Sequence, residues 1–269
     1  MNISKIIVAG TLTASSLFAH SLWVNSFNST TPKGGHTTVS IGWGHHLSID
    51  DSVPTKMKLN SFNLIDPSNQ AIALEMPLEK VEEIYKDAQL AISKSNMAMQ
   101  KISFQEKALK GTYSVALATK TGYFTKYIDI KGKERFKRLS KDKITDAKKI
   151  LQSNQINTFA KSYFVFNQWS APKPVGHPIE LIPTNDFTTI NQSEGVTFDV
   201  LLEGKPLSSG YVTAKSALNP RANALFAPVK KGKASFVVPH KGVWIFNVTH
   251  KTESDITHIQ KTSATLNIQ

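Results

Sequence analysis

Histidine supplies most of the chemistry that this sequence offers. The chain has eight histidines and no cysteine, so a transition-metal site must use imidazole, carboxylate, thioether or a terminal amine. Alternating apolar residues lead up to His45 and to His250, which places each imidazole at the end of a core-facing stripe, where a neutral ring can bind a divalent metal. His258 falls opposite His250 if residues 251–257 form a hairpin loop. The alternative for each is a rim histidine that bonds a backbone carbonyl.

The segment that follows His45 adds further candidate groups. His46 points to the other side of a regular strand, so it is a metal ligand only if Gly44 introduces a bulge. Asp50 and Asp51 lie shortly beyond. Their carboxylates are suited either to orienting an imidazole or to supplying an oxygen ligand, and the alternative is a simple turn.

The start of the chain decides whether a further histidine is available. Residues 1–19 have the basic start, apolar stretch and small residues of a secretory signal, and the apolar stretch is too short to span a bilayer. Cleavage after Ala19 makes His20 the first residue of the mature chain, with a free amine beside its imidazole. Cleavage after Ala14 or Ser16 is the alternative. We therefore expect a periplasmic protein, with His20 as a metal ligand.

Composition and missing motifs narrow the class of function. The net charge is +12, but the lysines are scattered and lack a recognition-helix or aromatic-interleaved pattern, so we expect no nucleic-acid partner. The charge indicates solubility, with peripheral or no membrane contact. The sequence has no Gly-x-Ser-x-Gly, no His-Glu-x-x-His and no glycine-rich phosphate loop. We therefore expect a binding protein and not an enzyme.

Most of the chain follows the period-two pattern of β-strands. The charged stretch at residues 131–155 spaces its apolar residues unevenly and predicts one or two surface helices, and residues 78–93 also suit a helix. A proline-rich stretch marks a linker at 171–176. We predict a mostly β fold in which two β-sandwich domains, residues 20–170 and 177–269, carry a short helical insertion.

Several short motifs occur in a characteristic order along the chain. They are AHSLWVN, SIGWGHH, GYFTKYID, FAKSYFVF, GHPIELIP and GKASFVVPHKGVWIFNVTH. In this order they resemble an exported bacterial family of unknown function that is described as the periplasmic component of cobalt or nickel ABC-type transport systems. The similarity spans nearly the whole mature chain.

The resemblance implies both a fold and a function. It implies two Ig-like or transthyretin-like β-sandwich halves, with the family's histidines at His20, His45 and His250. It also implies nickel or cobalt as the bound ion and subunits of an inner-membrane metal transporter as partners. Imidazole ligands bind Cu(II) or Zn(II) at least as well, so residue types alone do not select the metal.

Two other functions compete with metal delivery. One is a copper carrier or oxidase with a histidine brace, in which the amine and imidazole of His20 join a second imidazole. The other is a structural envelope module whose histidines bond only the backbone. The first requires cleavage after Ala19, and the second predicts that metal does not stabilise the fold.

Overall fold

The computed structural model confirms the predicted mostly β fold. It describes residues 21–29, 35–47, 50–51, 58–77, 82–94, 97–190 and 195–269. These residues form strands, turns and a 3-10 helix, η3 (Lys141–Lys143), and contain no α-helix. No helix in these ranges is long and apolar enough to cross a membrane.

The largest sheet in the described part of the chain has ten strands. They are β3 (Leu59–Ile65), β4 (Ala71–Ala73), β8 (Gly111–Thr119), β9 (Gly122–Asp129), β10 (Glu134–Lys137), β11 (Ala147–Phe166), β15 (Tyr211–Ser216), β16 (Leu225–Pro228), β18 (Gly242–Thr252) and β19 (Thr257–Ile268). Their order is β16-β15-β18-β19-β11-β8-β3-β4, and β9 pairs with both β11 and β10. The pair β11–β19 is parallel, while the other pairs are antiparallel.

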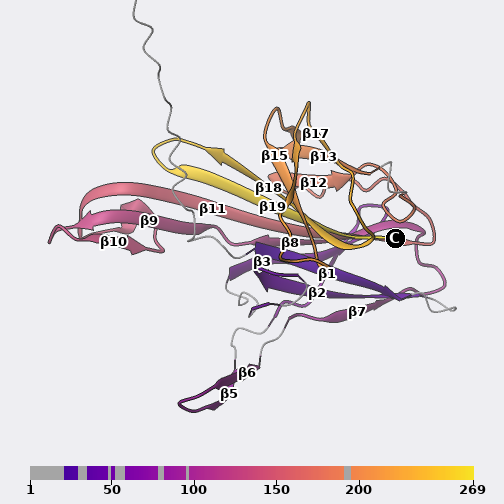
Figure 1. The fold of residues 1–269 in the computed structure, drawn as a ribbon, viewed down its shortest axis with the longest axis horizontal. Coiled ribbons are helices and arrows are strands. Elements are labelled where there is room, and N and C mark those ends of the chain that lie inside the picture. The colour runs from indigo at the N-terminus through magenta and orange to yellow at the C-terminus, as the bar shows by residue number, and fades with distance from the viewer. Residues whose placement is uncertain are drawn as a thin grey trace, which may run out of the picture.

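Smaller sheets cover the two faces of this central sheet (Figure 1). The first consists of β1 (Ser21–Ser29), β2 (His36–Gly44) and β7 (Gln100–Ser103). The second consists of β12 (Ile179–Pro183), β13 (Val196–Leu202), β14 (Lys205–Pro206) and β17 (Lys233–Phe236). A separate hairpin of β5 (Glu82–Lys86) and β6 (Ala91–Lys94) projects from the body.

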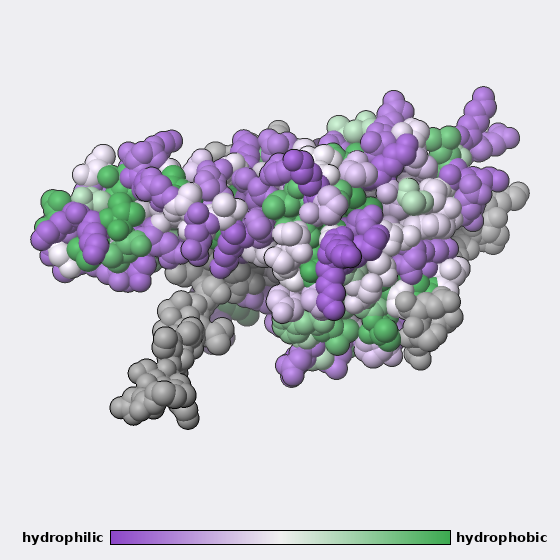
Figure 2. Space-filling view, turned by 90° about the horizontal axis from the view of Figure 1, so that it is seen from above, coloured by the Kyte–Doolittle hydropathy of each residue, from purple (hydrophilic) through white to green (hydrophobic). Residues whose placement is uncertain are grey.

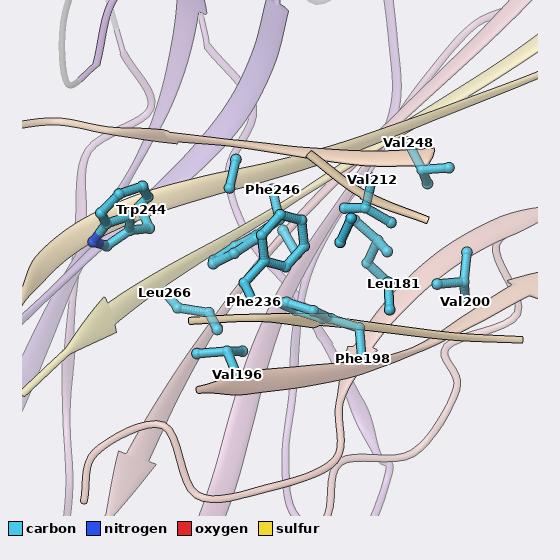
Figure 3. Close-up of a cluster of buried hydrophobic side chains, with 14 of the residues drawn as sticks. Leu181, Val196, Phe198, Val200, Val212, Phe236, Trp244, Phe246, Val248 and Leu266 are labelled. Atoms are coloured by element: carbon cyan, nitrogen blue, oxygen red, sulfur yellow. The ribbon is translucent and has the colours of Figure 1, made fainter. Parts of the chain in front are cut away.

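The long strand β11 supplies side chains to a hydrophobic core on each face. Successive residues of a strand point to opposite faces of its sheet. Accordingly, Ala160 and Phe164 are buried in the core under β1 and β2, while Phe159 and Tyr163 are buried in the core under β12 and β13. Figure 3 shows the second core, where the ring of Phe246 lies 4.6 Å from that of Phe198, centroid to centroid. The layers are therefore stacked as β-sheets pack in sandwiches.

One sheet carries strands from both predicted halves of the chain. Residues 154–162 of β11 pair with residues 257–265 of β19. The predicted linker between the halves is also attached to the body, because the Glu180 carboxylate accepts hydrogen bonds from the amides of Val175 (3.1 Å) and Gly176 (3.0 Å). The domain boundaries themselves stay a prediction.

The predicted helical insertion is wrong. The stretch 131–155 contains β10, η3 and the first half of β11, and β9 pairs with both strands. These strands extend beyond the two cores and expose hydrophilic and hydrophobic residues together (Figure 2), so the stretch lacks the alternation of a half-buried strand. Residues 82–94 form β5 and β6, in which every side chain is exposed, and no burial pattern marked them as strands.

Candidate functional site

A cavity of about 1040 Å³ opens on the central sheet beside β1. Its floor consists of alternate residues on neighbouring strands, since Thr213 pairs with Asn247 and Asn247 pairs with Ser263. These residues share one face of the sheet because directly paired residues point the same way. The Ser263 hydroxyl donates to the carbonyl of Leu22 (2.7 Å), which fixes β1 along one side of the cavity. We call this cavity the β1 pocket.

The end of β2 brings two predicted ligands into the β1 pocket. The strand ends at Gly44, and His45 and His46 both line the pocket with their ring centroids 6.2 Å apart. Gly44 has a φ of 133°, a conformation that residues with a Cβ rarely adopt. The chain thus leaves the regular strand at Gly44, and the strict alternation that would separate His45 from His46 no longer applies.

Asp50 holds the backbone of this segment. Its Oδ2 accepts hydrogen bonds from the amides of His45 and His46 and lies 3.6 Å from Nδ1 of His46. The hydrogen bond from the His45 amide is the largest effect on the Asp50 carboxyl, and its pKa is lowered despite some desolvation. Asp50 is therefore an ionised group that fixes the bend and contacts one imidazole.

Trp23 forms part of the wall behind these histidines. It is buried and pairs with Gly42 across the β1–β2 hairpin. A Cβ at Gly42 would lie 2.0 Å from the indole nitrogen of Trp23, which is closer than non-bonded atoms approach. Glycine at position 42 therefore allows the indole to lie across the strand.

The described lining residues of the β1 pocket include several cations and no aspartate or glutamate. The cations are Lys58, Lys120, Arg138, Lys215 and Lys261. Lys261 is half-buried, and its pKa is lowered by burial and by the charge of Lys251. Trp43, Phe124 and Phe136 add aromatic surface, and the rings of Phe124 and Phe136 stack at 5.8 Å. The pocket is basic and partly aromatic.

The other predicted ligands do not join His45. His250 ends the buried stripe of Trp244, Phe246 and Val248, as its phase predicts, and so belongs to the opposite face of the sheet. His250 pairs with Gln260, and His258 pairs with Thr252. The two histidines therefore lie diagonally on one face. They are not directly opposite, as we expected from a hairpin loop at residues 251–257. Nε2 of His250 lies 3.3 Å from the Thr252 hydroxyl.

His20 lies outside the described residues. Its neighbour Ser21 pairs with Gly44, directly before His45, and Ser21 lines the β1 pocket. Among the described residues, no group of three or more histidines and acidic residues is placed to hold a metal ion. The described part of the pocket therefore offers two imidazoles.

Comparison with known proteins identifies the family. Residues 17–252 match the family described as "Domain of unknown function (DUF4198)". This chain belongs to the DUF4198 family. The matched DUF4198 segment contains both strands of the β1–β2 hairpin, His45, His46 and β18. No curated protein shows significant sequence similarity to the chain.

A second polar group in the DUF4198 domain is buried between the central sheet and β12. Nζ of Lys161 contacts Oε2 of Glu180 at 2.6 Å, and both side chains are almost fully buried. His177 lies beside them against Phe159, and its Nδ1 is buried without a hydrogen-bond partner. Burial, followed by the charge of Lys161, lowers the pKa of His177 to about 4. Lys161 and Glu180 are closed to solvent, whereas His177 is half-buried, and the cluster joins β11 to β12.

Sequence reasoning missed the basic side of the β1 pocket. The lysines are scattered along the sequence, yet Lys215 and Lys261 come from different strands of one sheet face. Only the pairing of distant strands brings them together. The strand itself gives no local signal, because most residues of β19 are polar and a lysine does not stand out among them.

Proposed function

We propose that this protein is an exported metal-binding protein that captures a divalent transition metal, nickel or cobalt, and passes it to an inner-membrane transporter. The observation that carries the proposal is the presence of His45 and His46 together in the β1 pocket, next to the residue that follows His20. Nickel, cobalt and the transporter come from the family resemblance of the sequence motifs.

The side chains that follow β2 are suited to binding a metal ion. His45 and His46 are exposed neighbours, so a change of side-chain rotamer would bring both rings to a common ion, with metal–nitrogen distances of about 2 Å. Asp50 fixes the backbone of both residues and accepts a contact from one ring, which is how outer carboxylates orient ligating imidazoles. The proposed ligands are therefore His20, His45 and His46. His250 and His258 form a separate pair on the other face of the sheet.

Calorimetry with the metal-free mature protein tests the proposal. We expect NiCl2 or CoCl2 to bind at micromolar or tighter affinity, and we expect His45→Ala and His46→Ala each to weaken binding at least tenfold. His250→Ala is the matched control, because it removes an imidazole from the opposite face, and it should bind metal as the wild type does. Absence of binding by every first-row divalent ion would refute the proposal.

The intact mass of the exported protein determines the ligand set. A mature chain that starts at His20 and prefers copper would favour the histidine brace over nickel or cobalt delivery. A mature chain that starts at Ser15 or Leu17 excludes the brace, because the terminal amine then belongs to another residue. Unchanged thermal stability with and without metal would favour the structural envelope module.

A further inference from the structure

We infer that the β1 pocket binds a small organic anion with several carboxylates, and that the metal enters it as a complex with this anion. The anion site stands on the pocket's own residues. The choice of a metal-chelating carboxylate rests on the proposed function.

The size of the β1 pocket exceeds what a single ion needs. Its volume is about 1040 Å³, whereas one water molecule occupies about 30 Å³ in the liquid. Pockets for organic molecules have volumes of roughly 300–1,000 Å³. The pocket therefore has room for a complete small molecule beside a metal held at its rim by His45 and His46.

The charge of the pocket opposes a bare divalent cation. Five cationic side chains converge on it from separate segments, and its described lining has no carboxylate to offset them. Like charges in a concave site with low-dielectric walls repel a metal cation and concentrate anions. Asp50, the nearby acid, is already engaged by the amides of His45 and His46. A metal ion whose charge is balanced by the carboxylates of a chelating anion would remove this conflict.

The position of Lys261 points in the same direction. It pairs with Thr249 on the floor of the pocket and lies beside Thr158 of β11. Its side chain is half-buried, so this lysine belongs to the floor of the pocket and not only to its rim. A carboxylate bound over the floor would lie beside this cation, with the hydroxyl and amide groups of Thr213, Asn247 and Ser263 as further hydrogen-bond partners.

The aromatic walls favour an organic ligand over an inorganic ion. Trp43, Phe124 and Phe136 line the pocket with Leu22 and Ile156. Inorganic phosphate would contact the lysines but would leave this apolar surface exposed to water. A carboxylate-bearing molecule with a ring or a branched carbon skeleton uses both parts of the pocket.

Two aromatic dicarboxylates of similar shape can distinguish anion binding from metal binding. Isophthalate carries two carboxylates but lacks the ring nitrogen that makes pyridine-2,6-dicarboxylate a tridentate nickel chelator. We expect metal-free protein to bind isophthalate, detected by calorimetry and by a change in tryptophan fluorescence. We expect the nickel complex of pyridine-2,6-dicarboxylate to bind at least tenfold more tightly than isophthalate, because it also reaches the histidines.

Substitutions of pocket residues test whether isophthalate and nickel bind in the β1 pocket. Lys215→Ala and Lys261→Met should each weaken isophthalate binding at least fivefold and leave NiCl2 binding undiminished, whereas the double variant His45→Ala/His46→Ala should weaken only the metal-containing ligands. Lys205→Ala is the matched control, since Lys205 is an exposed lysine on β14 that does not line the pocket. Lys215 is itself exposed, so its variant should fold normally, which circular dichroism checks.

Several results would overturn the inference. They are the absence of isophthalate binding at 10 mM, isophthalate binding that both lysine variants leave unchanged, and inorganic phosphate binding as tightly as isophthalate. Tight binding of free nickel with no binding of the nickel–pyridine-2,6-dicarboxylate complex would also overturn it, while leaving the proposed metal site intact. Failure of free nickel to bind, with isophthalate still bound, would refute the metal site and the chelate but retain the anion site.

Discussion

The half-buried imidazole of His177 should make the fold lose stability in mild acid. Its pKa is lowered from 6.5 to about 4, first by burial and then by Lys161, with a smaller opposing effect of Glu180. In the unfolded chain the same group titrates near 6.5. Between these pH values the unfolded chain binds a proton that the folded protein does not, so the free energy of unfolding falls as the pH decreases from 6.5 to 4.

The size of this loss follows from the interval between the two pKa values. One pKa unit corresponds to ~1.4 kcal/mol, so the interval from 6.5 to about 4 is worth about 3 kcal/mol at most. This is a large part of the stability of a typical domain, which is about 5–15 kcal/mol. Well below pH 4 both states carry the proton, and the contribution of His177 no longer changes.

Urea denaturation between pH 7.5 and 4 measures this contribution against a matched variant. His177→Gln keeps a polar side chain at the site but removes the titrating group. We expect the wild type to lose about 3 kcal/mol more than the variant over this range, because other groups titrate equally in both proteins. Parallel pH profiles for the two proteins would refute the half-buried neutral imidazole, as would a folded-state titration of His177 near 6.5 by NMR.

Three further changes test other parts of the structure. Lys161→Met should lower the free energy of unfolding in urea by about 3–5 kcal/mol, because it leaves the Glu180 carboxylate buried without its cation. The double variant Lys161→Met/Glu180→Leu should recover most of this loss, and an equal loss in the single and double variants would contradict the prediction. Gly42→Ala should displace Trp23, costing about 1–3 kcal/mol and changing tryptophan fluorescence, whereas an unchanged spectrum would contradict the close contact. Asp50→Ala should weaken calorimetric metal affinity about 10–100-fold, and wild-type affinity would show that the bend needs no carboxylate.

Period-two patterns predicted most strands of the two cores. The segment 36–44 forms β2, and its buried Val39 and Ile41 lead up to His45 as predicted. The turn that follows β3 is equally local, because the Asp66 carboxylate accepts the amide of Gln70 at 2.8 Å. These features depend on neighbours in the sequence, which is why the pattern identifies them.

The wrong predictions concern residues whose environment is set by distant parts of the chain and not by the local sequence pattern. Strands 82–86 and 91–94 are exposed on both sides, so nothing in their apolar spacing distinguishes a strand from a helix. His250 has the predicted phase, but phase cannot tell which distant strand covers each side of a sheet. The structure places it across the sheet from His45, and only the pairing of β15, β18 and β19 could reveal this.

The position of β19 has a consequence for the order of folding. In the described sheet, β16, β15 and β18 are connected to β11 and β8 only through β19, and Asn154 pairs with Thr257 across a long sequence separation. Such non-local pairing slows folding, because the loop entropy is lost before the contacts form. The backbone N–H and C=O groups along one edge of β11 therefore stay unpaired until β19 has been synthesised, and during this interval the chain is most open to aggregation or to a chaperone.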